Sequence, residues 1–189
     1  MISVFTAYLL IPLYTLLFVY GTDWFSTNLS VIGSWPEMRD GFVFLGLLLL
    51  AYYCGALRRL LRYLPRRRLE TGMAGMAAFC LFLAVATPYL PKTVPLQARL
   101  HVVSAFASAV LLLAVLYRVV WRLSDRSGAA GRGLRLYRIG LILVTAGCVL
   151  LFWLAGIISS ALEVFFILSL TVWTQKLSGR IRCIFPESD

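Results

Sequence analysis

The chain has few of the side chains on which catalysis and metal binding usually depend. Its 189 residues include one histidine, four cysteines and eight Asp or Glu residues. A single histidine, His101, excludes bis-histidine haem ligation and a histidine-rich zinc site. The cysteines form no C-x-x-C motif, which excludes a disulfide-forming enzyme of that type. We therefore expect no metal and no cofactor.

Motifs for nucleotide and acyl chemistry are also missing. The chain has no Walker loop, no G-x-S-x-G elbow and no acidic cluster for Mg²⁺–phosphate chemistry. We expect no enzyme, although an acid–base enzyme that uses His101 and Glu163 stays open as an alternative. The net charge of +10 does not indicate nucleic-acid binding, because the basic residues lie in short clusters between apolar runs.

What the chain has in excess is hydrophobic residues. They make up 61% of it, and charged residues 14%, whereas soluble domains have about 45–50% and about 25%. This composition predicts an all-α integral membrane protein with a single transmembrane domain over residues 1–189. Pro12 predicts a kink in the first apolar run, which lacks the basic n-region of a signal peptide. Six runs are long enough to cross a hydrocarbon layer of about 30 Å as helices: residues 2–20, 41–57, 71–90, 96–121, 139–155 and 159–176.

Basic residues gather in alternate connections between these runs, which predicts six spans with both termini in the cytoplasm (N-in/C-in), in the inner membrane of a cell. The basic inner surface should attract anionic lipid headgroups. We interpret Arg118 as a side chain that snorkels, and residues 124–133 as a flexible linker. The inner basic residues are Arg58, Arg59, Arg62, Arg66, Arg67, Arg68, Arg118, Arg122, Arg126, Arg132, Arg135, Arg138, Lys176, Arg180 and Arg182, against Arg39, Lys92 and Arg99 outside.

Small residues recur at helical spacing in three of the runs. Such surfaces let helices approach closely in lipid, so we expect them to pack against neighbouring helices. They are Gly72, Gly75 and Ala78 in the third run, Ser104 and Ser108 in the fourth, and Gly140 and Gly147 in the fifth.

Two ionisable residues, His101 and Glu163, lie inside apolar runs at a similar depth, about 7 Å from the outer end. A charge there costs at least about 2.5 kcal/mol, so each needs a partner or a purpose. One hypothesis is a His101–Glu163 or Arg99–Glu163 pair that locks two helices together. The other is an outward-facing polar pocket. Its ligand-binding residues would be His101, Glu163, Asn28, Ser30, Gln97, Arg99 and Ser104.

Residues 28–33 of the first outer connection contain capping and turn residues, namely Asn28 and Ser30, and Gly33 permits a positive φ. This segment is either an interfacial element that closes the outer mouth or an ordinary loop. We expect the protein to bind a lipid or small amphiphile in the outer pocket. The alternatives are a proton-linked transporter or accessory subunit that uses Glu163, and a structural protein whose polar pairs only specify packing. Expected partners are membrane lipids and other membrane subunits.

Four short stretches resemble an uncharacterised family of bacterial six-span membrane proteins. They are Phe-Ser-Thr-Asn-Leu-Ser-Val-Ile-Gly at 25–33, Pro-Tyr-Leu-Pro at 88–91, Leu-His at 100–101 and Ser-Ala-Leu-Glu-Val-Phe-Phe at 160–166. The layout is more distantly similar to the DRAM-like six-span group. The resemblance implies a six-helix bundle whose shared residues gather on the outer side, around Asn28, Pro88, His101 and Glu163. It implies no particular activity.

Overall fold

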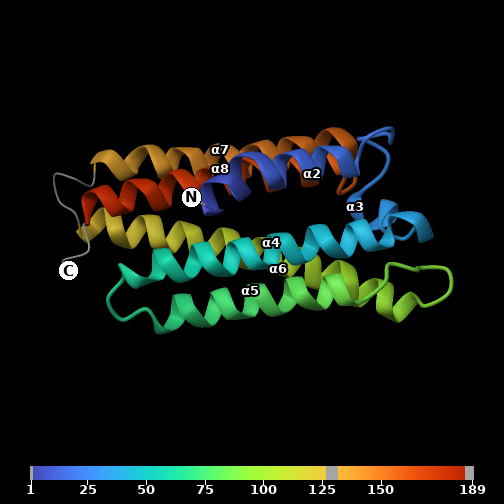
Figure 1. The fold of residues 1–189 in the computed structure, drawn as a ribbon, viewed down its shortest axis with the longest axis horizontal. Coiled ribbons are helices and arrows are strands. Elements are labelled where there is room, and N and C mark those ends of the chain that lie inside the picture. Colours follow the sequence, from blue (N-terminus) through green and yellow to red (C-terminus); the bar gives the residue numbers. More distant parts are fainter. Residues whose placement is uncertain (1, 127–131, 186–189) are drawn as a thin grey trace.

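The computed structural model describes residues 2–126 and 132–185, which form helices and no strand. The all-α prediction is therefore confirmed for this part of the chain. Five long helices run back and forth along the molecule, and a shorter N-terminal helical segment lies beside them (Figure 1). The long helices are α4 (Arg39–Arg62), α5 (Arg68–Ala86), α6 (Pro95–Arg126), α7 (Arg132–Ala155) and α8 (Ser160–Ile184). The N-terminal elements are α1 (Ile2–Phe5), η1 (Thr6–Leu10), α2 (Ile11–Phe18), α3 (Leu29–Ile32) and η2 (Pro36–Met38).

Prolines set several helix boundaries. The residue before a proline is restricted to extended backbone, and α5 accordingly ends just before Thr87, which precedes Pro88 and has ψ 129°. Helix α6 begins at Pro95. Proline is well suited to the first position of a helix, because a backbone N–H there would have no intrahelical partner. In the N-terminal segment, Pro12 follows a π-helical turn, η1, instead of an ordinary α-helical turn. A proline ring clashes with the carbonyl four residues earlier, and a wider turn relieves that clash.

The predicted linker at 124–133 is shorter than expected. Helix α6 continues through Arg126 and α7 starts at Arg132, and residues 127–131 lie outside the described part of the chain. The connection between α4 and α5 is a tight turn at residues 63–67, where Arg66 has φ 48°.

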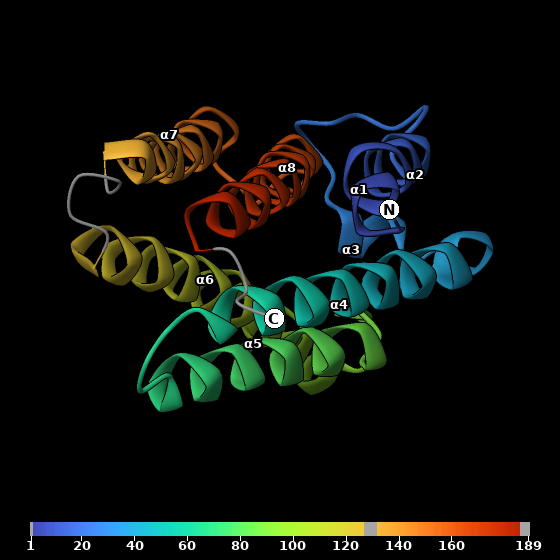
Figure 2. The same ribbon diagram turned by 60° about the vertical axis from the view of Figure 1, so that its left-hand side comes forward.

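Helix α8 occupies the middle of the bundle, between α7 and the N-terminal segment, and it also contacts α4 (Figure 2). Helices α4, α5 and α6 pack together on the other side, and α7 lies at the edge against α6 and α8. The bundle has two ends. The α3 end contains α3, residues 87–94 and residues 156–159, and the arginine end contains the turn at 63–67.

Close helix contacts form at two of the three predicted small-residue surfaces. A Cβ on Gly140 would overlap the ring of Trp173 in α8, and one on Gly147 would lie 2.6 Å from Phe165. In the fourth run, Ser108 donates a hydrogen bond of 2.9 Å to the carbonyl of Ala77 in α5. The expectation is wrong for Gly72 and Gly75 in α5, because a Cβ at either position would meet no atom within 4 Å. This face of α5 stays open.

Four helices are long and apolar enough to cross a membrane: α4, α5, α6 and α7. The structure is thus that of a helical membrane protein. The N-terminal helical stretch is apolar but shorter, and α8 has 25 residues. Helix α8 buries hydroxyl and amide side chains on its inward face, which lowers its hydropathy. Two tyrosines of α4 hydrogen bond there, Tyr52 to the carbonyl of Thr171 and Tyr53 to its hydroxyl, both at 3.0 Å.

Candidate functional site

The short helix α3 lies between the two ionisable residues that the sequence analysis singled out. Asn28 caps it by accepting a hydrogen bond of 2.8 Å from the N–H of Val31. The N–H of Leu29 donates to Oε2 of Glu163 at 2.6 Å, which satisfies one of the unpaired donors at the start of α3. A carboxylate at a helix N-terminus is also favoured by the helix dipole. Glu163 therefore fixes α3 onto α8.

The chain that leads into α3 is held by further contacts with α8. The N–H groups of Ser160 and Ala161, at the start of α8, donate to the carbonyls of Thr27 and Trp24 at 2.6 and 2.9 Å. Asp23 accepts a hydrogen bond of 2.7 Å from the Ser26 hydroxyl, and this bond holds the pKa of the Asp23 carboxyl below its usual value. The connection between α2 and α4 is thus an ordered structure and not an open loop.

His101 fixes the other side of α3. Its ring is 1% exposed, and Nδ1 lies 2.7 Å from the carbonyl oxygen of Ala84 and 2.9 Å from that of Thr87. Carbonyl oxygens only accept, so Nδ1 carries the proton. In the neutral ring Nε2 then accepts from the hydroxyl of Ser30, at 2.7 Å. Both nitrogens are satisfied by neighbouring elements of the fold, so the geometry of His101 is that of a structural residue.

The predicted pair between the two ionisable side chains is wrong for the described structure. His101 and Glu163 contact Ser30 and Leu29, consecutive residues of α3, and no ion pair joins Glu163 to His101 or to Arg99 in the described part of the chain. Leu29 and Ile32 of α3 are themselves buried. Helix α3 therefore lies between the two side chains that the predicted pocket would use.

The remaining residues of the predicted site make no hydrogen bond to α3 within the described chain. Gln97 and Arg99 are exposed near the start of α6, whereas Ser104 is buried one turn beyond His101. Gly33 has φ −68°, so it does not use the positive φ that the sequence suggested. It is needed for another reason, because a Cβ there would lie 2.5 Å from the ring of Phe42.

A different cavity opens at the arginine end. It has a volume of about 370 Å³ and lies between α4, α5 and α6. We call it the groove. Gly75 lines it on α5, and the open space beside this glycine is part of its volume. Its other lining residues are mainly apolar and include Leu50, Leu57, Leu61, Ala74, Ala78, Leu81 and Leu112.

Three arginines line one end of the groove: Arg58 and Arg62 on the last turns of α4, and Arg67 in the turn before α5. All three are exposed, and no acidic residue lines the groove within the described chain. The opposite end is narrower because α4 and α5 approach closely there. A Cβ on Gly46 would overlap the side chain of Val85. The groove is thus an apolar slot with a cationic mouth.

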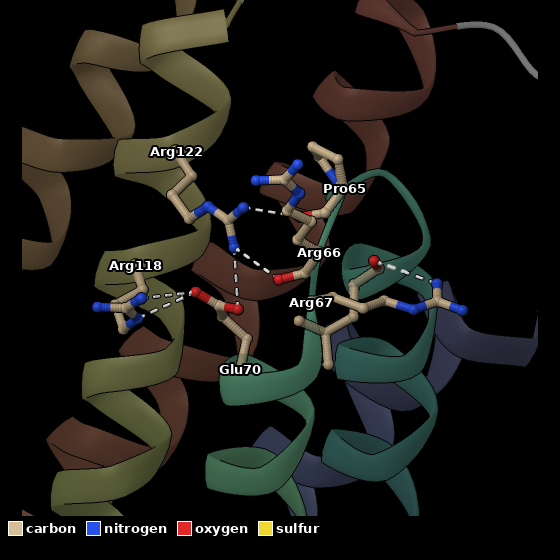
Figure 3. A network of polar contacts seen from close by, with 7 residues as sticks. Pro65, Arg66, Arg67, Glu70, Arg118 and Arg122 are labelled. Atoms are coloured by element: carbon tan, nitrogen blue, oxygen red, sulfur yellow. Dashed lines mark hydrogen bonds and ion pairs between the residues drawn. The ribbon is translucent and has the colours of Figure 1, made fainter.

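A buried carboxylate holds the turn beside this mouth (Figure 3). Glu70 is 0% exposed, and its Oε1 accepts hydrogen bonds from Nε and Nη2 of Arg118 at 3.0 and 2.9 Å. Its Oε2 lies 3.0 Å from Nη1 of Arg122, whose Nη2 donates to the carbonyl of Pro65 at 2.7 Å. The interpretation of Arg118 as a snorkelling side chain is therefore wrong, because it is an ion-pair partner that joins α6 to α5.

Sequence reasoning missed Glu70, although a signal was present. Glu70 is the only acidic residue between Arg58 and Asp125, a stretch that contains many arginines. A lone carboxylate among so many cations indicates an ion pair, but its partners depend on which helices are neighbours. The groove had no such signal, because small residues on a helix face are equally consistent with close packing.

Comparison with known proteins adds no functional information. No protein-family model matches the chain, and neither a curated protein nor a solved structure matches it. Among the described residues, no three His, Cys, Asp or Glu side chains gather in a group that could hold a metal ion. The function is therefore inferred from the geometry of the groove and its mouth.

Proposed function

We propose that the protein is a six-span protein of the inner membrane with both termini in the cytoplasm. Four helices satisfy the length and hydropathy of a span. The N-terminal segment and α8 would be the other two, because α8 has 25 residues, which is about 37 Å of helix. The distribution of arginines supports a cytoplasmic arginine end. The resemblance to bacterial six-span proteins and to the DRAM-like group agrees with this proposal.

Within this topology, we infer that the protein binds an anionic amphiphile in the groove, with its headgroup at the arginines and its apolar part between the helices. The observation that carries this function is the combination of an apolar slot and a cationic mouth in one cavity. From Arg67 to Leu81 the groove follows about 20 Å of α5. It would therefore receive an acyl chain from the cytoplasmic leaflet, while guanidinium groups bind the phosphate.

The geometry favours this site over the outward-facing pocket. A ligand between His101 and Glu163 would have to displace α3, which is capped, hydrogen bonded on both sides and buried at Leu29 and Ile32. The groove is open without any such rearrangement. Proton-linked transport through Glu163 predicts pH-dependent uptake into proteoliposomes, whereas amphiphile binding in the groove predicts none.

A glycine substitution tests the apolar slot. Gly75→Leu places a side chain in the groove, and Gly72→Leu is a matched control, because Gly72 lies one turn earlier on α5, faces open space and does not line the groove. The full chain is purified in mild detergent, and retained phospholipid is counted by native mass spectrometry. We expect Gly75→Leu to lose bound phospholipid and Gly72→Leu to keep it. Equal retention in both variants would refute binding in the groove.

An arginine substitution tests the mouth. Arg58→Gln removes a groove arginine, and Arg68→Gln removes an exposed arginine that does not line the groove. A basic residue near anionic headgroups contributes about 1 kcal/mol, so Arg58→Gln should weaken binding of phosphatidylglycerol about fivefold. Arg68→Gln should change it little. If the two substitutions weaken binding equally, the headgroup is attracted by the surface in general and not by the groove.

A further inference from the structure

A second cleft lies at the arginine end, on the other side of α4. Its volume is about 160 Å³, and it is lined by Arg59, Arg62, Ser178 and Arg182 together with Leu60 and Tyr63. It therefore joins the last turns of α4 to the last turns of α8. Arg62 lines both this cleft and the groove. The two cavities thus meet at one arginine.

The second cleft has a cationic lining. Arg59 is half-buried and positioned by a hydrogen bond of 3.0 Å from its Nη2 to the hydroxyl of Ser3. Its Nε is buried and has no hydrogen-bond partner within the described residues. The charged groups that the cleft exposes are those of Arg62 and Arg182, whose side chains are exposed. No acidic residue lines the cleft in the described chain.

The spacing of the arginines along α4 brings the two anion sites close together. Arg58 and Arg59 precede Arg62 by four and three residues, so both are its neighbours on the helix surface, with about 5–6 Å between Cβ atoms. Arg58 faces the groove and Arg59 faces the second cleft. Two phosphates joined by a short linker can therefore bind on the two sides of α4, with Arg62 between them.

We propose that the amphiphile is a lipid with two phosphates, a diphosphatidylglycerol (cardiolipin), that binds across the end of α4. One phosphate lies at Arg58, Arg62 and Arg67 in the mouth of the groove, and the other lies at Arg59 and Arg182 in the second cleft. A lipid with a single phosphate fills only one of these sites. This inference rests on the proposed function, because one acyl chain of the lipid occupies the groove.

The test compares two lipids with the same acyl chains, tetraoleoyl cardiolipin and dioleoyl phosphatidylglycerol, at equal phosphate concentration. Binding to the purified full chain is measured by native mass spectrometry. The wild-type protein should bind cardiolipin at least tenfold more tightly. Arg182→Gln should weaken the binding of cardiolipin about fivefold and leave the binding of phosphatidylglycerol unchanged. Arg182→Lys should keep the preference for cardiolipin. Arg180→Gln is the matched control, since Arg180 is an exposed residue of α8 that lines neither cavity.

The outcomes separate the two proposals. Equal affinity for the two lipids, or an equal loss for both in Arg182→Gln, would overturn the two-phosphate inference while the groove still binds phosphatidylglycerol. If Gly75→Leu leaves the binding of both lipids unchanged, the groove is not a lipid site and both proposals fail. Arg182 is exposed, so its substitution should not alter the unfolding temperature.

Discussion

The ion pairs of Glu70 allow a quantitative prediction about stability. Glu70→Gln removes the carboxylate that pairs with Arg118 and Arg122, and the Glu70 side chain is 0% exposed. Breaking a fully buried pair by removing one partner costs about 3–5 kcal/mol. The two arginine side chains are 44% and 32% exposed, so they can turn toward water or lipid phosphate, and glutamine keeps one acceptor oxygen. We therefore expect a loss of about 2 kcal/mol.

For a chain of this size, that loss lowers the unfolding temperature by about 4–8 °C. Thermal unfolding of the detergent-solubilised protein, followed by tryptophan fluorescence, measures it. Glu37→Gln is the control, because Glu37 is an exposed acidic residue in η2. The double variant Glu70→Gln with Arg118→Gln should lose less than the sum of the single losses, since both substitutions break the same contact. An unfolding temperature equal to that of Glu37→Gln, or strictly additive losses, would refute the assignment of Glu70 as a buried anchor of the turn.

Three further substitutions test the packing and the α3 end by the same unfolding measurement. Gly140→Ala should destabilise by about 1–3 kcal/mol, because its Cβ overlaps Trp173, and a neutral result would mean that α7 and α8 are further apart. Asn28→Ala should cost about 1 kcal/mol through loss of the α3 cap, and no loss would show that α3 is not capped as described. Ser30→Ala should cost about 1–3 kcal/mol because it leaves Nε2 of the buried His101 unpaired, and stability equal to wild type would contradict that contact.

The helices could be predicted because the length and hydrophobicity of each apolar run by themselves indicate a helix. The start of α6 at Pro95 lies one residue from the predicted start at 96, whereas the predicted run 71–90 passes through Pro88 and α5 ends before it, at Ala86. The capping role of Asn28 was similarly local, since its side chain bonds three residues ahead. These features depend on neighbours in the sequence, so no tertiary information was required to anticipate them.

The candidate site depended on tertiary contacts and was predicted less well. The sequence singled out His101 and Glu163 as polar residues that need a partner or a purpose, but it had no means of placing α3 between them. The sequence predicted close helix packing at both Gly140 and Gly75. Gly140 packs against Trp173, whereas Gly75 faces open space. Only the arrangement of α4, α5 and α6 distinguishes a packed face from the wall of a groove.

The direct test of amphiphile binding in the groove is photolabelling in a membrane. A phosphatidylglycerol with a diazirine near the end of one acyl chain is incorporated into a membrane that contains the full chain. After photolysis, the labelled peptides are mapped by mass spectrometry. We predict that label concentrates on the deep groove residues Ala78, Leu81 and Leu112 and is lost in Gly75→Leu. Label that instead follows lipid exposure, with Leu143 and Val149 of α7 as the main sites at 64% and 63% exposed, would contradict the groove as the binding site.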